Sequence, residues 1–422
     1  MDNNKKKPNR LIRFWKILGP GLVTGSSDDD PSGIATYSQA GAAYGLSTLW
    51  TALITFPLMA SIQEMCARIG LVTSHGLTGT LKTSYPKPIL YLMVLFSFPA
   101  IIMNIGADIA GMGAVGNLLC PSIHAIFFSI FFTILLLVLI IYMPYQKIAS
   151  VLKYLCIVLL VYLIVPFLCK QDWAVVLKGT FIPTIKFDKD FIGILVAILG
   201  TTISPYLFFW QANMEVEEIK QMKKHLVINK KIIHDLRQDV DFGMLFSNLV
   251  MFFIILTTGT VLFNGGIHQI NTVEQAAQAL KPLAGNFAYL LFAIGVIGTG
   301  LLAIPVLCGS LSYIITETFG WKQGLDKKFH EAKGFYIIIS ISLILGLFMN
   351  YMGISPIKAL IYSAILYGMT APVLIAIILH IANNKKVMGK YTNGIRSNIL
   401  GFSTLVLMTV AAVILIYMQL TD

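Results

Sequence analysis

Long apolar segments separated by short polar connections follow one another along the whole chain. Eleven of them reach the length of about 20 residues that an α-helix needs to cross a membrane. They cover residues 13–41, 46–70, 88–117, 124–143, 148–169, 190–218, 240–264, 285–316, 335–351, 355–381 and 397–419. The pattern predicts an all-α polytopic membrane protein, with eleven transmembrane helices in a single domain over residues 1–422.

The first apolar segment is interrupted at Gly25–Thr36, which reads GSSDDDPSGIAT. A charge at bilayer depth costs on the order of 3 kcal/mol. Pro31 cannot donate a backbone hydrogen bond, and it disfavours helical geometry at Asp30. We therefore expect a transmembrane helix that is unwound at Asp30–Gly33, with free carbonyls and a carboxylate facing a cavity. The alternative is a surface loop between two short helices.

The sixth segment has a similar interruption, formed by Gly200, Thr201, Thr202, Ser204 and Pro205. Because the two interruptions are five spans apart, they predict two five-helix repeats of opposite orientation. The repeats would cover residues 13–169 and 190–381, followed by an extra helix at 397–419. Alternatively, the two prolines produce simple kinks packed against neighbouring helices.

Composition agrees with a membrane protein: 56% of the residues are hydrophobic, only 12% are charged, and the mean hydropathy is +0.78. The net charge of +11 does not indicate nucleic acid, because the basic residues lie in the connections between spans. They alternate from side to side as the positive-inside rule requires, except in connection 170–189. This predicts a cytoplasmic N-terminus and an external C-terminus in a plasma membrane, a bacterial inner membrane by preference. We expect no removed signal peptide.

The residues typical of enzymes and cofactor sites do not form a recognisable constellation. Five cysteines are scattered without a CxxC pair, and seven histidines lie in connections or at span ends. We expect neither an enzyme nor a bound cofactor. The basic stretch 220–237 predicts a surface helix that contacts anionic lipid rather than nucleic acid.

Asp30 is the strongest candidate for chemistry. At the first interruption its carboxylate would face the hydroxyls and carbonyls of the second, where Thr201, Ser204 and Tyr206 lie. Oxygen ligands favour hard cations such as Mg²⁺, Mn²⁺ and Ca²⁺. The sequence therefore predicts a divalent-cation site between the two interruptions.

Further acidic residues lie near this site. Asp28 and Asp29 are expected on its cytoplasmic, better hydrated side, and the glutamates of span 6 (Glu215, Glu217 and Glu218) follow at the end of that span. Together they are expected to line an acidic vestibule, unless the glutamates are only a solvated helix end. Asp108 and Glu64 are the other deep acids. Glu64 is expected to pair structurally with Arg68 or Asn104, whereas the role of Asp108 stays open.

At these interruptions the chain resembles the Nramp family of divalent-metal transporters. The family's DPGN signature in the first helix corresponds to Asp30–Gly33 (DPSG), followed by small residues. Its A-x-x-M-P-H signature in the sixth helix corresponds to Thr201–Tyr206 (TTISPY), and its D-x-A-E to Asp108–Gly111 (DIAG). The resemblance covers all eleven spans. It implies a LeuT-type fold of the APC superfamily, with helices 1 and 6 unwound midway.

The ligand positions depart from the family pattern. The family's metal-binding Asp is retained as Asp30, but its Asn is replaced by Gly33 and its Met by Ser204. Alignment on Pro372 places Ala364 where the family has a Gln in helix 10. The site implied by the resemblance is thus wider and contains Asp30, Gly33, Thr201, Ser204 and Tyr206. This pattern is similar to the Nramp-related magnesium transporters, and a partly hydrated Mg²⁺ suits such a site.

The family's proton-pathway residues are also replaced. The Glu of helix 3 is Gly111, the two histidines of helix 6 correspond to Tyr206 and Gln211, and span 335–351 contains no Arg. We therefore expect a monomeric secondary transporter that imports Mg²⁺, and also Mn²⁺, by alternating access without proton coupling.

Several alternatives stay open. The first is a proton-coupled Mn²⁺/Fe²⁺ transporter of the Nramp type. The second is an amino-acid or amine symporter, which Asp30 disfavours because a substrate carboxylate needs free N–H groups and no acid beside it. The third is a non-transporting sensor, which we disfavour because the chain ends just after the last span, at Asp422.

Overall fold

The computed structural model describes residues 19–143, 147, 161–221 and 228–421. Every regular element in these ranges is helical, which confirms the predicted all-α class. The α-helices are α2 (Pro20–Asp28), α3 (Pro31–Tyr44), α4 (Trp50–Thr73), α5 (Leu77–Ser84), α6 (Lys87–Leu119), α7 (Ala125–Tyr142), α9 (Val161–Leu168), α10 (Trp173–Phe181), α11 (Lys189–Thr202), α12 (Pro205–Gln221), α13 (Lys230–Thr258), α14 (Val273–Ala277), α15 (Lys281–Ala284), α16 (Ala288–Phe319), α17 (Lys333–Met349), α18 (Pro356–Asn383), α19 (Lys385–Met388) and α20 (Ile395–Thr421). Short 3₁₀ or π segments are η2 (Gly259–Phe263), η3 (Gln278–Leu280), η4 (Gly285–Phe287), η5 (Asn350–Met352) and η6 (Gly389–Tyr391).

Eight helical stretches in the described ranges are long and apolar enough to cross a membrane, and they coincide with eight of the eleven predicted spans. They cover Lys87–Leu119, Ala125–Tyr142, Lys189–Lys220, Lys230–Phe263, Val273–Phe319, Lys333–Met352, Pro356–Asn383 and Ile395–Thr421. The chain is thus a multi-pass membrane protein.

The three other predicted spans differ in kind. Span 46–70 is the 24-residue helix α4, which carries Gln63, Glu64 and Arg68 and is not among the eight. Span 13–41 begins outside the described residues and continues as two short helices, α2 and α3. Most of span 148–169 lies outside the described residues, as does part of the predicted surface helix 220–237. The count of eleven stays a prediction.

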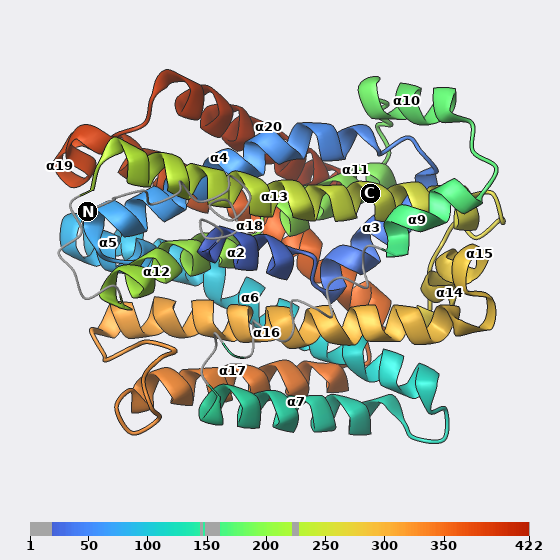
Figure 1. Cartoon of the computed structure of the whole chain (residues 1–422), viewed down its shortest axis with the longest axis horizontal. Coiled ribbons are helices and arrows are strands. Elements are labelled where there is room, and N and C mark those ends of the chain that lie inside the picture. The colour runs from blue at the N-terminus through green and yellow to red at the C-terminus, as the bar shows by residue number, and fades with distance from the viewer. Residues whose placement is uncertain (1–18, 144–146, 148–160, 222–227, 422) are drawn as a thin grey trace, which may run out of the picture.

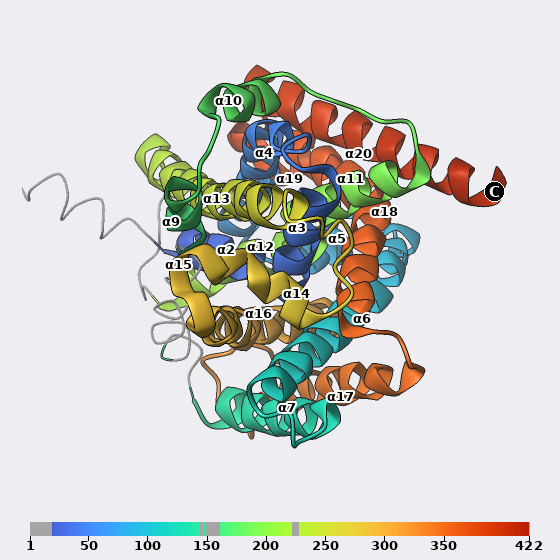
Figure 2. The ribbon, with the colours of Figure 1, turned by 90° about the vertical axis from the view of Figure 1, so that its right-hand side faces the viewer.

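The two short helices α2 and α3 lie in the middle of the bundle (Figure 1). Helix α13 packs along both of them, α12 and α16 contact α2, and α11 and α18 contact α3. On one side of the bundle α7 and α17 lie side by side against α6 (Figure 2). Helix α20 packs on α11 and α18.

The outer surface is apolar, as lipid contact requires. Large hydrophobic side chains are exposed along the peripheral helices, for example Leu95, Phe131, Ile344 and Val406. Inside the bundle, by contrast, small residues bring helices close together. A Cβ atom at Gly25 would collide with the backbone of Gly243, so α2 and α13 touch backbone to backbone. Such small-residue contacts are typical of helix packing in membranes.

Candidate divalent-cation site

The helical geometry of the chain stops between α2 and α3, at Asp29 and Asp30. Asp30 is the N-cap residue of α3, and Pro31 follows at the first helical position, where its missing N–H costs no hydrogen bond. The Oδ1 atom of Asp30 accepts hydrogen bonds of 2.7 Å from the backbone N–H of Gly33 and from the hydroxyl of Ser32. The local sequence therefore fixes one oxygen of the carboxylate.

A second interruption separates α11 from α12, at Ile203 and Ser204. The Ser204 hydroxyl donates to the carbonyl of Thr201, one turn earlier. The two interruptions lie against each other: the hydroxyl oxygens of Ser32 and Thr201 are 3.5 Å apart, and the Tyr206 hydroxyl donates to the carbonyl of Ser27 over 2.7 Å. The structure thus brings the predicted residues of both interruptions together.

The second oxygen of Asp30 is held by residues from other helices. Asn104, on α6, donates from Nδ2 to Asp30 Oδ2 over 2.8 Å. The same Nδ2 lies 3.5 Å from Oδ2 of Asp108. On the other end of the amide, Ser363 of α18 donates from its hydroxyl to Asn104 Oδ1 over 2.8 Å. Three helices therefore position the carboxylate of Asp30.

Four carboxylates are buried around the interruptions: Asp28, Asp29, Asp30 and Asp108 are each at most 1% exposed. None of the ion pairs in the described ranges involves any of them. One oxygen each of Asp28, Asp29 and Asp108 has no hydrogen-bond partner. Burying carboxylate charge without a compensating cation is costly, so this arrangement fits the binding of a cation.

The ligands of such a cation would be of mixed type. The described residues contain no group of three or more His, Cys, Asp or Glu side chains in metal-binding geometry. A cation at Asp30 would therefore complete its shell with backbone carbonyls, hydroxyls, amide oxygens and water, which hard cations accept.

The prediction that Asp28 and Asp29 are hydrated is wrong. The hydroxyl of Ser247, on α13, donates to Asp28 Oδ2 over 2.7 Å and lies 3.3 Å from Asp29 Oδ1. The physical reason is the close contact of Gly25 with Gly243, which lets α13 cover this face of α2. Sequence spacing gave no indication that α13 would be the neighbour.

The predicted acidic vestibule is also different in the structure. Glu215 is 6% exposed and accepts a 2.9 Å hydrogen bond from Gln211, whose amide oxygen accepts one from Thr24. Glu215 is thus neither a solvated helix end nor a vestibule wall here, because α12 packs it inside the bundle. Glu218 is half-buried at the end of the same helix.

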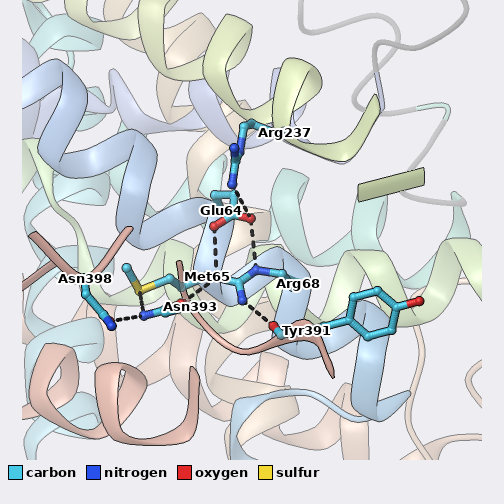
Figure 3. A network of polar contacts seen from close by, with 7 residues as sticks. All are labelled: Glu64, Met65, Arg68, Arg237, Tyr391, Asn393 and Asn398. Carbon is cyan, nitrogen blue, oxygen red and sulfur yellow. Dashed lines mark hydrogen bonds and ion pairs between the residues drawn. The ribbon is translucent and has the colours of Figure 1, made fainter. Parts of the chain in front are cut away.

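The pairing predicted for Glu64 is confirmed. Arg68 donates from Nε to Glu64 over 2.9 Å, one helical turn apart on α4, and both side chains are buried (Figure 3). Arg68 also donates to the Tyr391 carbonyl and to Asn393, and Arg237 of α13 lies 3.5 Å from Glu64. This network ties α4 to the connection between α18 and α20, away from the interruptions.

Sequence reasoning missed three residues of the site: Asn104 as the partner of Asp30, and Ser247 and Ser363 as hydroxyl donors. Asn104 precedes Asp108 by four residues on one helix, so the shared face was visible in the sequence. Both serines reach the site through contacts between distant segments, and no local pattern marks them.

Comparison with known proteins gives a consistent result. The family model for natural resistance-associated macrophage protein-like proteins matches residues 21–418. The divalent metal cation transporter MntH of Caldanaerobacter subterraneus subsp. tengcongensis is 24% identical over 421 residues, covering 97% of this chain and 94% of that protein. MntH of Klebsiella pneumoniae subsp. pneumoniae is 23% identical over 400 residues, covering 93% and 91%.

Solved structures show the same fold. The Eremococcus coleocola manganese transporter, in complex with an aromatic bis-isothiourea substituted compound, superimposes with a TM-score of 0.79 at 15% identity, covering 97% of this chain and 87% of that one. The nucleobase-cation-symport-1 family transporter Mhp1, in a closed conformation, superimposes with a TM-score of 0.54 at 12% identity, covering 95% and 91%. Since the family model covers nearly the whole chain, this protein belongs to the Nramp family, whose members are transporters that need no cofactor and are not enzymes.

Proposed function

We propose that this protein imports Mg²⁺ and Mn²⁺ across a bacterial inner membrane by alternating access, with Asp30 as the central ligand and without proton coupling. The observation that carries the proposal is the burial of Asp30, between two interrupted helices, with no cationic side chain paired to it in the described ranges. The printed names of the relatives, divalent metal cation transporter and manganese transporter, support the class of substrate.

The chemistry around Asp30 favours hard cations. The groups that contact its carboxylate are a hydroxyl, a backbone N–H and an amide, from Ser32, Gly33 and Asn104. A cation would use the carboxylate together with oxygens at Thr201 and Ser204, which lie across the second interruption. Gly33 keeps this space free, because a Cβ there would lie 3.3 Å from the Thr201 hydroxyl. A site with room for water suits Mg²⁺, which releases its waters reluctantly.

Alternating access requires a gate on each side of the site, and closed contacts lie on both sides. Next to Pro31 an apolar contact zone leaves only about 10 Å³ of space between α3, α6, α14, α16 and α18. The side-chain amide of Gln39, on α3, donates a hydrogen bond to the His268 carbonyl and accepts one from the backbone N–H of Ile270. These two bonds hold the segment before α14 in place. At the opposite end of the broken helix, Asp239 of α13 binds the start of α2.

Within this proposal the two interrupted helices are helices 1 and 6 of eleven, in two inverted repeats, and they move relative to the surrounding bundle. The basic connections support a cytoplasmic position for the start of α2. The gate at α2 is then the inner gate, and the gate at α14 is the outer gate. We further propose that the protein acts as a monomer in the lipid bilayer.

Uncoupled transport is supported by the residues at the proton-pathway positions. Gly111 has no titratable group, the Tyr206 hydroxyl is bonded to a backbone carbonyl, and Gln211 bridges Thr24 and Glu215. The membrane potential alone can drive import. A divalent ion that moves down 100 mV gains about 4.6 kcal/mol, enough for an accumulation on the order of 10³.

A second candidate function is proton-coupled Mn²⁺ transport. It is favoured by the buried acids Asp28, Asp29 and Asp108, each of which has an unpaired oxygen. The manganese transporter among the related structures has the same fold.

Uptake by the purified protein in liposomes tests the proposal. Mn²⁺ should enter under an inside-negative potential, and a hundredfold excess of external Mg²⁺ should suppress its uptake, whereas amino acids should not. Uptake that resists Mg²⁺ would restrict the substrate to Mn²⁺ and similar ions. Suppression by an amino acid, without metal uptake, would favour a symporter.

A further inference from the structure

The amide of Asn104 occupies an unusual position, because its amino group faces two carboxylates. Asn104 is fully buried, and its Nδ2 atom lies 2.8 Å from Asp30 Oδ2 and 3.5 Å from Asp108 Oδ2. Neither acid has a cationic partner among the ion pairs of the described residues. The point between two such oxygens is where a cation would be held most strongly, and the amino group now fills it.

We infer that Asn104 has two roles in the transport cycle: it is a hydrogen-bond donor to Asp30 in the empty carrier and an oxygen ligand of the cation in the loaded carrier. A rotation of its side-chain amide switches it from one role to the other. In the empty carrier Nδ2 donates to Asp30, as in this structure. In the loaded carrier the amide has turned, the cation takes the place of Nδ2, and Oδ1 is one of its oxygen ligands. The inference rests on the proposed function, because it assumes that the cation binds at Asp30.

Ser363 allows both orientations. Its hydroxyl oxygen lies 2.8 Å from Asn104 Oδ1 and 2.8 Å from the carbonyl of Leu360. A hydroxyl donates one hydrogen bond and accepts others, so it donates to only one of these oxygens at a time. When it donates to Asn104, the amide stands as observed. When it donates to Leu360, its oxygen accepts from the turned Nδ2, and neither end of the buried amide loses its partner.

The empty carrier needs such a donor. A uniporter must return without cargo, and in that step the carboxylate of Asp30 would be buried with one oxygen unbonded if Asn104 were absent, since Ser32 and Gly33 both bind the other oxygen. An unsatisfied buried charge raises the energy of the return step. The cation-bound carrier has no such need, because the cation itself compensates Asp30.

The two roles give separate readouts with Asn104→Leu, a substitution of similar size. Net Mn²⁺ uptake into empty liposomes requires the return of the empty carrier, whereas exchange of external for internal Mn²⁺ does not. With saturating external Mn²⁺ in both measurements, and saturating internal Mn²⁺ in the exchange measurement alone, the ratio of net uptake to exchange should fall about tenfold or more, as expected for the loss of a hydrogen bond to a charged group. The control is Asn213→Leu, which removes a buried amide on α12 that donates to the Phe209 carbonyl of the same helix and has no other hydrogen bond within the described residues.

Calorimetric titration of the detergent-purified variants with Mn²⁺ measures the ligand role. The Kd for Asn104→Leu should rise about tenfold or more, and the control should match the wild type. An unchanged flux ratio or an unchanged Kd would overturn the inference. If Asn104→Leu is not recovered as a folded protein, the same measurements on Asn104→Ala decide. Wild-type protein that neither binds nor transports Mn²⁺ would instead contradict the proposed function.

Discussion

The carboxylate of Asp239, on α13, accepts a 2.6 Å hydrogen bond from the backbone N–H of Gly21 in the first turn of α2. Its other oxygen accepts from the N–H groups of Gly19 (2.7 Å) and Leu22 (3.3 Å). The first N–H groups of a helix have no partner within the helix, and Gly19 supplies no side-chain cap. Asp239 therefore caps α2 from another helix and holds the N-terminal turn of α2 on α13.

Asp239→Asn should weaken the closed inner gate. The substitution removes the charge and turns an NH₂ group toward backbone N–H donors, a loss of about 1.5–3 kcal/mol. The probe is Ser27→Cys in a background without the five native cysteines. With Asp239→Asn added, this cysteine should react at least about tenfold faster than without it, when a membrane-impermeant maleimide is applied from the side of the membrane on which α2 begins. The control is Asp241→Asn, a half-buried acid on the same helix. Equal labelling rates in both variants would show that Asp239 does not keep the inner gate closed.

The contact of Gly25 with Gly243 makes a separate prediction about stability. Gly25→Ala forces a Cβ into the backbone of α13 and should lower the free energy of unfolding by about 1–3 kcal/mol, as overpacking does. Gly193→Ala is the control, since the nearest atom to its added Cβ lies 3.9 Å away. Thermal unfolding of the purified proteins should show a lower Tm for Gly25→Ala alone. A Tm equal to that of Gly193→Ala would mean that the helices separate easily here.

Selectivity should follow the residues at the two interruptions. Ser204→Met with Gly33→Asn introduces a sulfur ligand and fills space beside Thr201, where a Cβ at position 33 is already tight. We expect Mg²⁺ transport to fall more than Cd²⁺ transport, because sulfur favours softer ions and the smaller site excludes water. Competition of each ion against Mn²⁺ uptake measures the change, with Gly33→Asn alone as the control for volume. An unaltered Mg²⁺/Cd²⁺ ratio would place the selectivity elsewhere.

Proton coupling can be tested separately from metal transport. A pH-sensitive dye inside liposomes should report no acidification when Mg²⁺ or Mn²⁺ is added outside at a fixed membrane potential, while a metal-sensitive dye reports uptake. The physical reason is that Gly111, Tyr206 and Gln211 leave no titratable chain at the positions where the family relays protons. Acidification that scales with metal concentration, and is absent from protein-free liposomes, would favour the proton-coupled alternative. The proton carrier would then be Asp28, Asp29 or Asp108.

The local features of the site could be predicted from the sequence, and the contacts between distant segments could not. Proline and successive acids marked the end of α2 at Asp28, and the spacing of Glu64 and Arg68 marked an i, i+4 pair. The burial of Asp28 depends instead on Ser247, which is 219 residues away in the chain. The same holds for Ser363, 259 residues from Asn104. Hydropathy identifies a span but does not say which span packs beside it.

The central claim is that the charge of Asp30 binds the transported cation, and Asp30→Asn tests it most directly. Asparagine is as good an N-cap as aspartate, so α3 should keep its start and the protein its fold. The measurement is Mn²⁺ uptake into liposomes by Asp30→Asn and by the control Asp241→Asn, at equal reconstituted amounts. We expect uptake by Asp30→Asn to fall to the level of protein-free liposomes, while the control transports Mn²⁺ at the wild-type rate. Uptake by Asp30→Asn at the wild-type rate would contradict the account.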